Sequence, residues 1–259
     1  MIHPSAEIGP GAVVAKRVSV GPFAVIEPGA VIDEECSIAA HAVIRRHARI
    51  GRNCRIDSFA VVGGDPNHLE FDPETESTVE IGPGCVLRES TTVHRSIVSG
   101  GSTRLGGECF LMAGAHVGHD CDIGDRVVIA NDAMTAGHVS VASDCFLGGN
   151  CAIHQFIRIG KGVMIGGTSR ITKDIAPYCR VSERDQIGGL NLVGLRRKKI
   201  PSEAIRDLKR LYHAVLRTPG NPVEAAAAQD LPESTEGRTF LEFFIPSKRG
   251  YAKSVASRS

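Results

Sequence analysis

Residues 20–44 have the sequence VGPFAVIEPGAVIDEECSIAAHAVI, in which every sixth position is valine or isoleucine. The same spacing runs from Ile2 to Val62, and after an interruption it resumes from Ile81 to Ile171 with exceptions only at Ser99 and Thr135. A period of six fits neither an amphipathic helix nor a two-faced strand in a flat sheet. It is typical of hexapeptide repeats, in which three hexads close one triangular coil of a parallel β-helix.

A second column of small residues supports this interpretation, because alanine or cysteine often follows the aliphatic residue by four positions. Glycine often follows it directly, and we expect these glycines to supply unusual backbone angles at the corners. Seven of the eight cysteines belong to the small-residue column and only Cys179 does not; the seven are Cys36, Cys54, Cys85, Cys109, Cys121, Cys145 and Cys151. We interpret them as small buried hydrophobic residues, because no CxxC pair indicates a zinc site or a disulfide framework.

Composition narrows the class of protein. The chain has 259 residues, 42% of them hydrophobic, and its 30 basic and 29 acidic residues give a net charge of +1. This balance excludes a chain-wide nucleic-acid footprint, and the apolar content is too high for a disordered protein. No apolar run approaches the ~20 residues of a membrane span, and the N-terminus lacks the pattern of a signal peptide. Together with reduced thiols, these features favour the cytoplasm.

The hexads predict an all-β solenoid over residues 1–186, with twenty-seven hexads in nine coils. Residues 63–80, GGDPNHLEFDPETESTVE, lack the repeat and are expected to form a protruding loop. Long loops on rigid scaffolds often carry function. Ser99 replaces an aliphatic residue and indicates a smaller excursion from the prism.

Residues 187–259 are expected to form a connector and a small helical domain. The connector, 187–200, is rich in glycine and ends in four basic residues, Arg196–Lys199. Residues 201–217 have apolar positions at helical spacing, and 221–229 and 237–246 resemble two shorter helices. We expect the tail, 247–259, to be loosely held.

Eighteen residues per coil predict which side chains lie above one another. His119 falls below Gly137, which falls below Gln155, while Asp120 falls below His138. His119, His138 and His154 should therefore meet at one corner of three successive coils. Three imidazoles beside a carboxylate and an amide indicate a functional site rather than three independent surface residues.

Two chemistries suit such a corner. Three histidines can hold a catalytic zinc ion, as in hexapeptide-fold carbonic anhydrases. Alternatively, a histidine deprotonates an acceptor group in an acyl transfer, while a backbone N–H such as that of Gly137 stabilises the oxyanion. The zinc interpretation leaves the basic C-terminal domain and the long loop unexplained.

Several longer motifs carry a family resemblance. They are GPFAVI (21–26), VEIGPGCVLRESTTVHR (79–95), LMAGAHVGHDCDIGDRVVIAN (111–131), AGHVSV (136–141), GGNCAIHQF (148–156) and NLVGLRR (191–197). With these motifs the chain resembles the UDP-N-acetylglucosamine acyltransferases, whose members catalyse the first step of lipid A synthesis. The resemblance covers nearly the whole chain, and it implies a left-handed winding and a homotrimer with active sites between adjacent prisms.

The resemblance also implies a reaction and its residues. An (R)-3-hydroxyacyl chain would pass from the phosphopantetheine of acyl carrier protein to the sugar 3-position of a UDP-hexosamine, without another cofactor or a metal. His119 would be the general base, with Asp120 beside it, and the Gly137 N–H would be the oxyanion donor. Substrate contacts would come from Asn67, His68, His116, His138, His154, Gln155, Asn191, Arg197 and Lys198. Gly167 matches a position that limits acyl-chain depth, and a glycine there favours a long chain. The basic residues Arg196–Lys199 could also attract the acidic carrier protein.

Three positions depart from the family pattern on the acceptor side. His68 stands where an aspartate is common, Glu70 where a lysine is common, and Val193 where a glutamate is common. A 3-amino sugar therefore remains open as the acceptor. Other open alternatives are the later N-acyltransferase of lipid A synthesis, a zinc carbonic anhydrase and a non-catalytic scaffold. The N-acyltransferase normally has an extra N-terminal domain, whereas the repeats here begin at residue 2.

Overall fold

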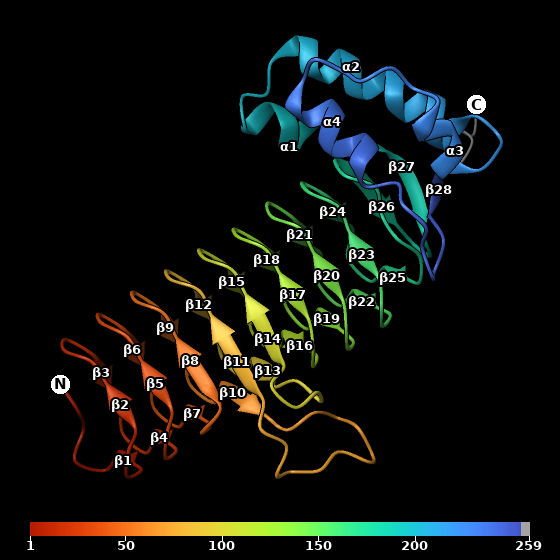
Figure 1. The fold of residues 1–259 in the computed structure, drawn as a ribbon. Helices are drawn as coiled ribbons and strands as arrows, with labels where there is room; N and C mark the ends of the chain where they lie inside the picture. Colours follow the sequence, from red (N-terminus) through yellow and green to blue (C-terminus); the bar gives the residue numbers. More distant parts are fainter. Residues whose placement is uncertain (255–259) are drawn as a thin grey trace.

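The structure is a computed structural model that describes residues 1–254, and it is a triangular prism with helices at one end. Successive short strands join three sheets in turn, and almost all pairs are parallel, as expected for a left-handed parallel β-helix. Figure 1 shows the coils stacked from the N-terminal end towards the helices. The predicted fold class is confirmed.

The first sheet has nine strands: β1 (Glu7–Ile8), β4 (Val25–Ile26), β7 (Val43–Ile44), β10 (Val61–Gly64), β13 (Thr92–His94), β16 (His116–Val117), β19 (Met134–Thr135), β22 (Ala152–Ile153) and β25 (Arg170–Ile171). The second sheet has eight: β2 (Val13–Val14), β5 (Val31–Ile32), β8 (Ala48–Ile50), β11 (Thr78–Ile81), β14 (Ser102–Leu105), β17 (Asp122–Ile123), β20 (Ser140–Val141) and β23 (Arg158–Ile159).

The third sheet has eleven strands: β3 (Ser19–Val20), β6 (Ser37–Ile38), β9 (Arg55–Ile56), β12 (Val86–Leu87), β15 (Phe110–Leu111), β18 (Val128–Ile129), β21 (Phe146–Leu147), β24 (Met164–Ile165), β26 (Cys179–Ser182), β27 (Gln186–Leu190) and β28 (Lys253–Ser254). Only the β26–β27 pair is antiparallel. The expected boundary between the solenoid and the C-terminal domain, between residues 186 and 187, falls at the start of β27. This boundary stays a prediction.

The aliphatic residues of the hexads fill the interior of the prism. Ile26, Ile56, Leu111 and Ile129, one from each of four coils, are completely buried. All eight cysteines are buried free thiols, and most of them donate to a backbone carbonyl of the next coil, as Cys145 does to Gly160 at 3.1 Å. These contacts agree with cysteine as a small core residue.

The glycines that follow the aliphatic residues have a different role from the one expected. Gly106 and Gly148 do not have positive φ; a Cβ on either would lie 2.6 Å from a backbone carbon of the next coil. The left-handed backbone angles of the corners belong mostly to other residues, such as Asp120 and His138. Gly106 and Gly148 are thus required by the close approach of stacked coils.

Two coils are longer than eighteen residues, and the second of them corrects the expected count of twenty-seven hexads, which included one at Ser99. Ile56 pairs with Leu87, and Leu87 pairs with Leu111, because extra residues leave the prism after β10 and after β13. The first insertion is the loop 65–77, shorter than the expected 63–80, because β10 and β11 include its flanking residues. The second is 95–101, so that Ser99 lies in an excursion and not in a hexad.

Five helical segments pack on the C-terminal end of the prism: α1 (Leu192–Arg197), α2 (Ser202–Tyr212), the π-helical turn η1 (His213–Arg217), α3 (Pro222–Ala227) and α4 (Thr235–Glu242). The three predicted helices are present, but the connector is not a plain loop, since it contains most of β27 and the helix α1. No helix within residues 1–254 is both long and apolar enough to cross a membrane.

The tail also differs from expectation. Tyr251 is buried, and β28 pairs with β27, so residues 247–254 are held against the end of the prism. The Arg158 guanidinium explains this, because it contacts the Tyr251 hydroxyl at 2.9 Å and the buried Asp174 at 2.8 Å. Residues 255–259 lie outside the described residues.

Candidate active site

The predicted site lies where the first sheet turns into the second. We call this edge the histidine corner, made of residues 118–121, 136–139 and 154–157. The His138 N–H donates to the His119 carbonyl at 2.9 Å, and the Phe156 N–H donates to the Gly137 carbonyl at 3.2 Å. The expected stacking of His119, Gly137 and Gln155 is therefore confirmed.

His119 and Asp120 form a hydrogen-bonded pair. His119 Nδ1 lies 2.7 Å from Asp120 Oδ2, and both side chains are largely shielded from solvent. Asp120 also accepts from the Ser96 hydroxyl and, at 3.2 Å, from the Ile97 N–H. With Nδ1 facing the carboxylate, Nε2 of His119 is left to exchange a proton with a substrate.

Asp120 is held in its charged form. Burial acts to raise the pKa of the carboxyl, but hydrogen bonds from Ser96, His119 and Ile97 outweigh it and lower that pKa below its ordinary value. His138 lies nearby, with Nε2 3.9 Å from Asp120 Oδ2. A carboxylate that stays ionised can orient an imidazole and stabilise the imidazolium formed when it accepts a proton.

Gly137 leaves room for the His119 ring. A Cβ on Gly137 would lie 2.3 Å from Cε1 and 2.4 Å from Nε2 of His119, so that a larger residue would displace the imidazole. Among residues 1–254 the Gly137 N–H has no acceptor. An unpaired backbone donor beside the free nitrogen of a histidine is suited to an oxyanion.

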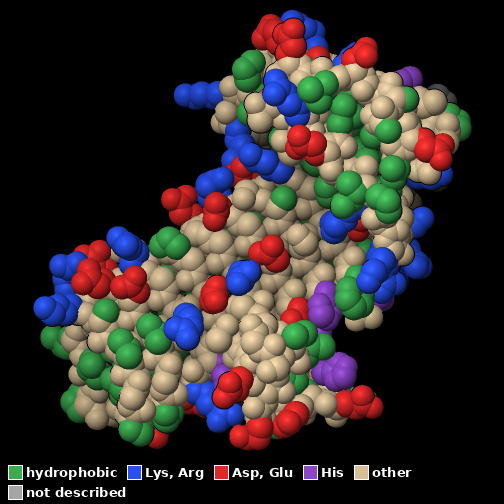
Figure 2. All heavy atoms as spheres, in the orientation of Figure 1, with side chains coloured by type: hydrophobic (Ala, Val, Ile, Leu, Met, Phe, Trp, Pro, Cys, Tyr) green, Lys and Arg blue, Asp and Glu red, His purple; other side chains and the backbone are tan. Residues whose placement is uncertain are grey.

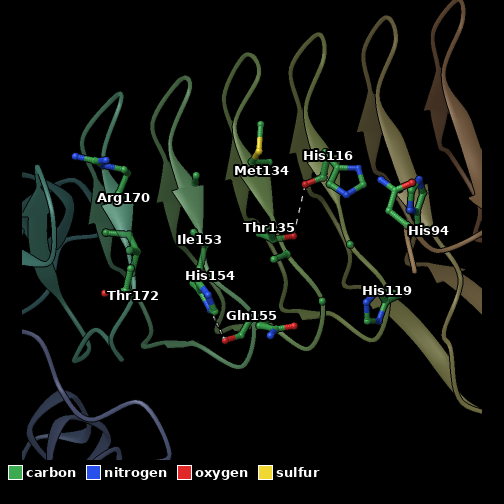
Figure 3. A pocket seen from close by; sticks show the side chains of 16 residues that line it. His94, His116, His119, Met134, Thr135, Ile153, His154, Gln155, Arg170 and Thr172 are labelled. Atoms are coloured by element: carbon green, nitrogen blue, oxygen red, sulfur yellow. Dashed lines mark hydrogen bonds between the residues drawn. The ribbon is translucent and has the colours of Figure 1, made fainter. Parts of the chain in front are cut away.

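A groove of about 570 Å³ runs from this corner along the outer face of the first sheet. His116, Met134, Ala152 and Arg170 point outward from successive strands of that sheet and line its floor. Figure 3 shows His94 and His116 at one end and Arg170 and Thr172 at the other, with His154 and Gln155 between them. The floor is thus apolar in its middle, at Met134 and Ala152, and polar at its ends, at His116 and Arg170.

His94 is a groove residue that the sequence analysis missed. Its ring is perpendicular to that of His116 at 4.7 Å between centroids, and His116 Nδ1 bonds the Thr92 hydroxyl at 2.7 Å. An offset of eighteen residues between stacked positions does not pair β13, which carries His94, with β16, which carries His116. The insertion at 95–101 raises the offset between these strands to twenty-four residues, so that Thr92 pairs with His116. The break at Ser99 was the signal that could have revealed it.

The electrostatics of the groove disfavour protonated histidines. Burial, with repulsion from His116 and His119, lowers the pKa of His94 to about 4. Burial likewise lowers the pKa values of His116 and His138. At neutral pH these three imidazoles are therefore neutral hydrogen-bonding groups.

The loop 65–77 emerges at the histidine corner. Asn67 lines the groove, and the His68 ring stands perpendicular to that of His119 with centroids 6.5 Å apart. Glu70 is exposed and donates its backbone N–H to His68 Nδ1 at 3.3 Å. Figure 2 shows several histidines on the flank of the prism that carries this loop.

Four other predicted residues lie elsewhere in the chain. Gly167 is at the corner between the third and first sheets and does not line the groove. Asn191 caps α1, accepting from the Gly194 N–H at 3.0 Å and donating to the Gly162 carbonyl at 3.1 Å. Lys198 Nζ pairs with Asp144 at 2.5 Å, and Arg197 is exposed beside it.

Asn191 and Lys198 thus line a separate cavity of about 280 Å³ at the corner between the second and third sheets. Val193 is exposed near it. A single chain does not bring these residues to the groove.

A zinc site of three histidines does not match the geometry. Within residues 1–254, the group close enough to share an ion is His119, Asp120 and His138, without His154. The oxygens of Asp120 are already engaged by three donors, and Nδ1 of His119 is one of them. The arrangement fits a histidine–carboxylate pair better than a ligand set.

The family models match both parts of the chain. A model described as bacterial transferase hexapeptide repeats matches residues 11–46 and 102–137. A model described as domain 2 of UDP-N-acetylglucosamine O-acyltransferase matches residues 174–252. An acyl-[acyl-carrier-protein]–UDP-N-acetylglucosamine O-acyltransferase of Halorhodospira halophila is 41% identical over 96% of this chain and 98% of its own length. The chain belongs to this acyltransferase family.

Other members of this family are similar to the chain over nearly its whole length. The acyltransferase of Anaeromyxobacter dehalogenans is 40% identical over 97% of this chain and 99% of its own length. Among solved structures, LpxA of Acinetobacter baumannii has a TM-score of 0.93 at 33% identity, covering 97% of this chain and 99% of its own. The UDP-N-acetylglucosamine acyltransferase of Campylobacter jejuni has a TM-score of 0.90 at 33% identity, covering 98% and 99%.

Proposed function

We propose that this acyltransferase moves an (R)-3-hydroxyacyl chain from acyl carrier protein to the 3-position of UDP-N-acetylglucosamine, the first step of lipid A biosynthesis. The observation that carries the proposal is the His119–Asp120 pair, whose free Nε2 lies beside Gly137 and its unpaired N–H in an open groove. This arrangement supplies a base and an oxyanion donor at one point.

The proposed reaction has two proton transfers. His119 Nε2 accepts the proton of the sugar hydroxyl while that oxygen attacks the thioester carbonyl, and the oxyanion accepts a hydrogen bond from the Gly137 N–H. The C–S bond then breaks, and the phosphopantetheine thiolate takes the proton from the imidazolium, which Asp120 stabilises. The thioester is a substrate, so we propose that the chain needs no cofactor or metal of its own.

We propose a place in the groove for each of the two substrates. The apolar floor formed by Met134 and Ala152 suits the acyl chain, and His116 adds a hydrogen-bonding group beside it. His154 and Gln155, which line the groove at the corner, suit polar contacts, whereas His138 lies outside the lining and is stacked on Phe156. Asn67 and His68 lie on the acceptor side of His119. Because Gly167 lies outside the groove lining, its influence on acyl-chain length stays a prediction.

We propose that the working form is a homotrimer. The groove and the residues Asn191, Arg197 and Lys198 occupy different edges of one prism, so they can serve one sugar nucleotide only if neighbouring prisms pack side by side. The exposed basic residues Arg196–Lys199 then offer charges for phosphates or for the acidic carrier protein. Free thiols and the pathway support a cytoplasmic location.

The direct test is mass spectrometry of the product. The purified protein is incubated with UDP-N-acetylglucosamine and a mixed pool of 3-hydroxyacyl carrier proteins, and a monoacylated sugar nucleotide is expected. Absence of any acylated product from an intact trimeric preparation would refute the proposal.

The acceptor is tested in the same assay with the 3-amino analogue in place of UDP-N-acetylglucosamine. His68 is the residue that motivates this arm, because it stands over His119 where the family commonly has aspartate. A higher kcat/KM for the amino sugar would assign N-acylation, whereas no turnover of it would leave the hydroxyl sugar as the acceptor.

A further inference from the structure

Two consecutive residues, Arg95 and Ser96, begin the insertion that follows β13, and their side chains contact different parts of the site. Both insertions of the chain, 65–77 and 95–101, leave the prism at the histidine corner. The loop 65–77 contains no helix or strand. Apart from the Gly100 N–H, which donates to the Glu76 carbonyl at 2.7 Å, the rest of the chain holds it through side-chain contacts.

Arg95 supplies most of those contacts. Its side chain is only 1% exposed, and its guanidinium donates to the Asp65 carboxylate at 2.9 Å, to the Pro73 carbonyl at 2.6 Å and to the Thr75 carbonyl. It also lies 4.7 Å from the centre of the Phe71 ring. A buried cation needs all its donors satisfied, and here the partners come from both ends of one loop.

Ser96 continues the network towards the base. Its hydroxyl donates to Asp120 Oδ1, and the next residue, Ile97, donates its N–H to Asp120 Oδ2 at 3.2 Å. The end of the loop is joined to the same residue, because the Ser77 hydroxyl donates to the Ser96 carbonyl at 2.6 Å. Asp120 in turn holds His119 Nδ1 at 2.7 Å.

We infer that Arg95 and Ser96 are positioning residues that fix the loop 65–77, with Asn67 and His68, against the His119–Asp120 pair. Arg95 holds the loop and Ser96 holds the carboxylate, and one peptide bond sets the distance between the two. This inference rests on the proposed function for its kinetic consequences, whereas the anchoring of the loop is independent of it.

The anchoring is tested by amide hydrogen exchange of the free protein. Arg95→Lys cannot keep the forked contacts of the buried guanidinium. Asp65→Asn removes the ion pair from the other side, at an exposed loop residue, so it should stay folded even if Arg95→Lys destabilises the prism. Exchange within residues 65–77 is expected to rise about tenfold in both variants. The matched control is Arg104→Lys, which changes an exposed arginine of β14 that pairs with Glu80 of β11 and should leave loop exchange unchanged.

Kinetics test the two roles separately. Arg95→Lys and Asp65→Asn should raise KM for UDP-N-acetylglucosamine about tenfold, with kcat and the donor KM within about twofold. Ser96→Ala should lower kcat about tenfold, while KM for the sugar nucleotide and hydrogen exchange of the loop stay unchanged. The control is Ser140→Ala, which changes an exposed serine of β20 and should leave kcat unchanged.

Unchanged loop exchange in Asp65→Asn and Arg95→Lys would overturn the inference, as would a wild-type kcat in Ser96→Ala. Failure of the wild-type protein to acylate the sugar nucleotide would instead count against the proposed function, because the exchange measurement needs no substrate.

Discussion

At the scale of single residues, the absence of a side chain at Gly137 is as important as the presence of His119. A methyl group at residue 137 would overlap the imidazole, with 2.4 Å to Nε2. Gly137→Ala should therefore tilt the ring away from the substrate and lower kcat by about 10²-fold, the effect of a lost general base. Steady-state kinetics with both substrates saturating measure this loss.

Gly166→Ala is the matched control for that change. A Cβ at residue 166 would meet no atom closer than 3.5 Å, so it should alter neither kcat nor thermal stability. An equal loss in both variants would show that the effect comes from general disturbance of the prism and not from His119.

The buried imidazole of His94 predicts how stability depends on pH. An unfolded histidine titrates near pH 6.5, whereas burial and the neighbouring imidazoles lower the pKa of His94 to about 4 in the folded protein. As the pH falls from 6.5 towards 4 the unfolded chain binds the proton first, so stability is lost in that window. At pH 5 the loss is of the order of 2 kcal/mol.

His94→Asn removes this group and should flatten the fall in stability between pH 7 and pH 5. Thermal unfolding at several pH values measures the slope, with His3→Asn, an exposed residue, as the control. The carboxyl of Asp120 also has a lowered pKa, but it affects stability only below about pH 4. An unchanged slope in His94→Asn would contradict the account.

At the scale of elements, Arg158 joins the prism to the C-terminal segment. From β23 its guanidinium pairs with Asp174, bonds the Tyr251 hydroxyl and lies 4.8 Å from the centre of the Phe243 ring. Arg158→Met leaves the buried Asp174 carboxylate without its cation, which typically costs about 3–5 kcal/mol. We expect a lower melting temperature and faster hydrogen exchange over residues 249–254.

Arg104→Met provides the comparison, because its ion pair with Glu80 is exposed on both sides and such pairs contribute at most about 1 kcal/mol. If the two substitutions lower the melting temperature equally, Arg158 does not hold the segment as described.

The sequence predicted the repeating elements well because their cause is periodic. Every hexad places one aliphatic residue inside, so Ile129 or Leu111 could be assigned to the core by counting. Counting fails where the chain leaves the period, as at Ser99, because an insertion changes which strands meet without changing the pattern on either side. The tail was likewise missed, since Tyr251 is held by Arg158, about ninety residues away in sequence.

The candidate site follows the same division. His119, Gly137 and Gln155 were predicted to stack because they lie eighteen residues apart within an unbroken stretch, and they do. His94 was missed because an insertion separates it from His116, and the contacts of Arg95 depend on how an irregular loop folds. Asn191 and Lys198 were assigned from the family resemblance, and the single chain places them on another edge.

At the scale of the whole molecule, the groove and Lys198 lie on different edges of one prism, and this predicts complementation between inactive variants. His119→Ala disables the groove, and Lys198→Ala disables the other edge, so each homogeneous assembly should be nearly inactive. Mixed assemblies refolded or expressed together should regain activity, because some interfaces then pair an intact groove with an intact Lys198 from a neighbour.

Light scattering should report a mass three times that of the 27.5 kDa chain for each preparation. Mixtures that stay as inactive as their components would show that each chain acts alone.

The proposed acyl transfer at the histidine corner depends above all on His119 as the general base. The most direct measurement is kcat of His119→Ala with saturating UDP-N-acetylglucosamine and hydroxyacyl carrier protein, beside His3→Ala as a surface control. A loss of about 10²-fold or more with an unchanged melting temperature is predicted. A value of kcat within about twofold of the wild type would contradict general-base catalysis at this corner.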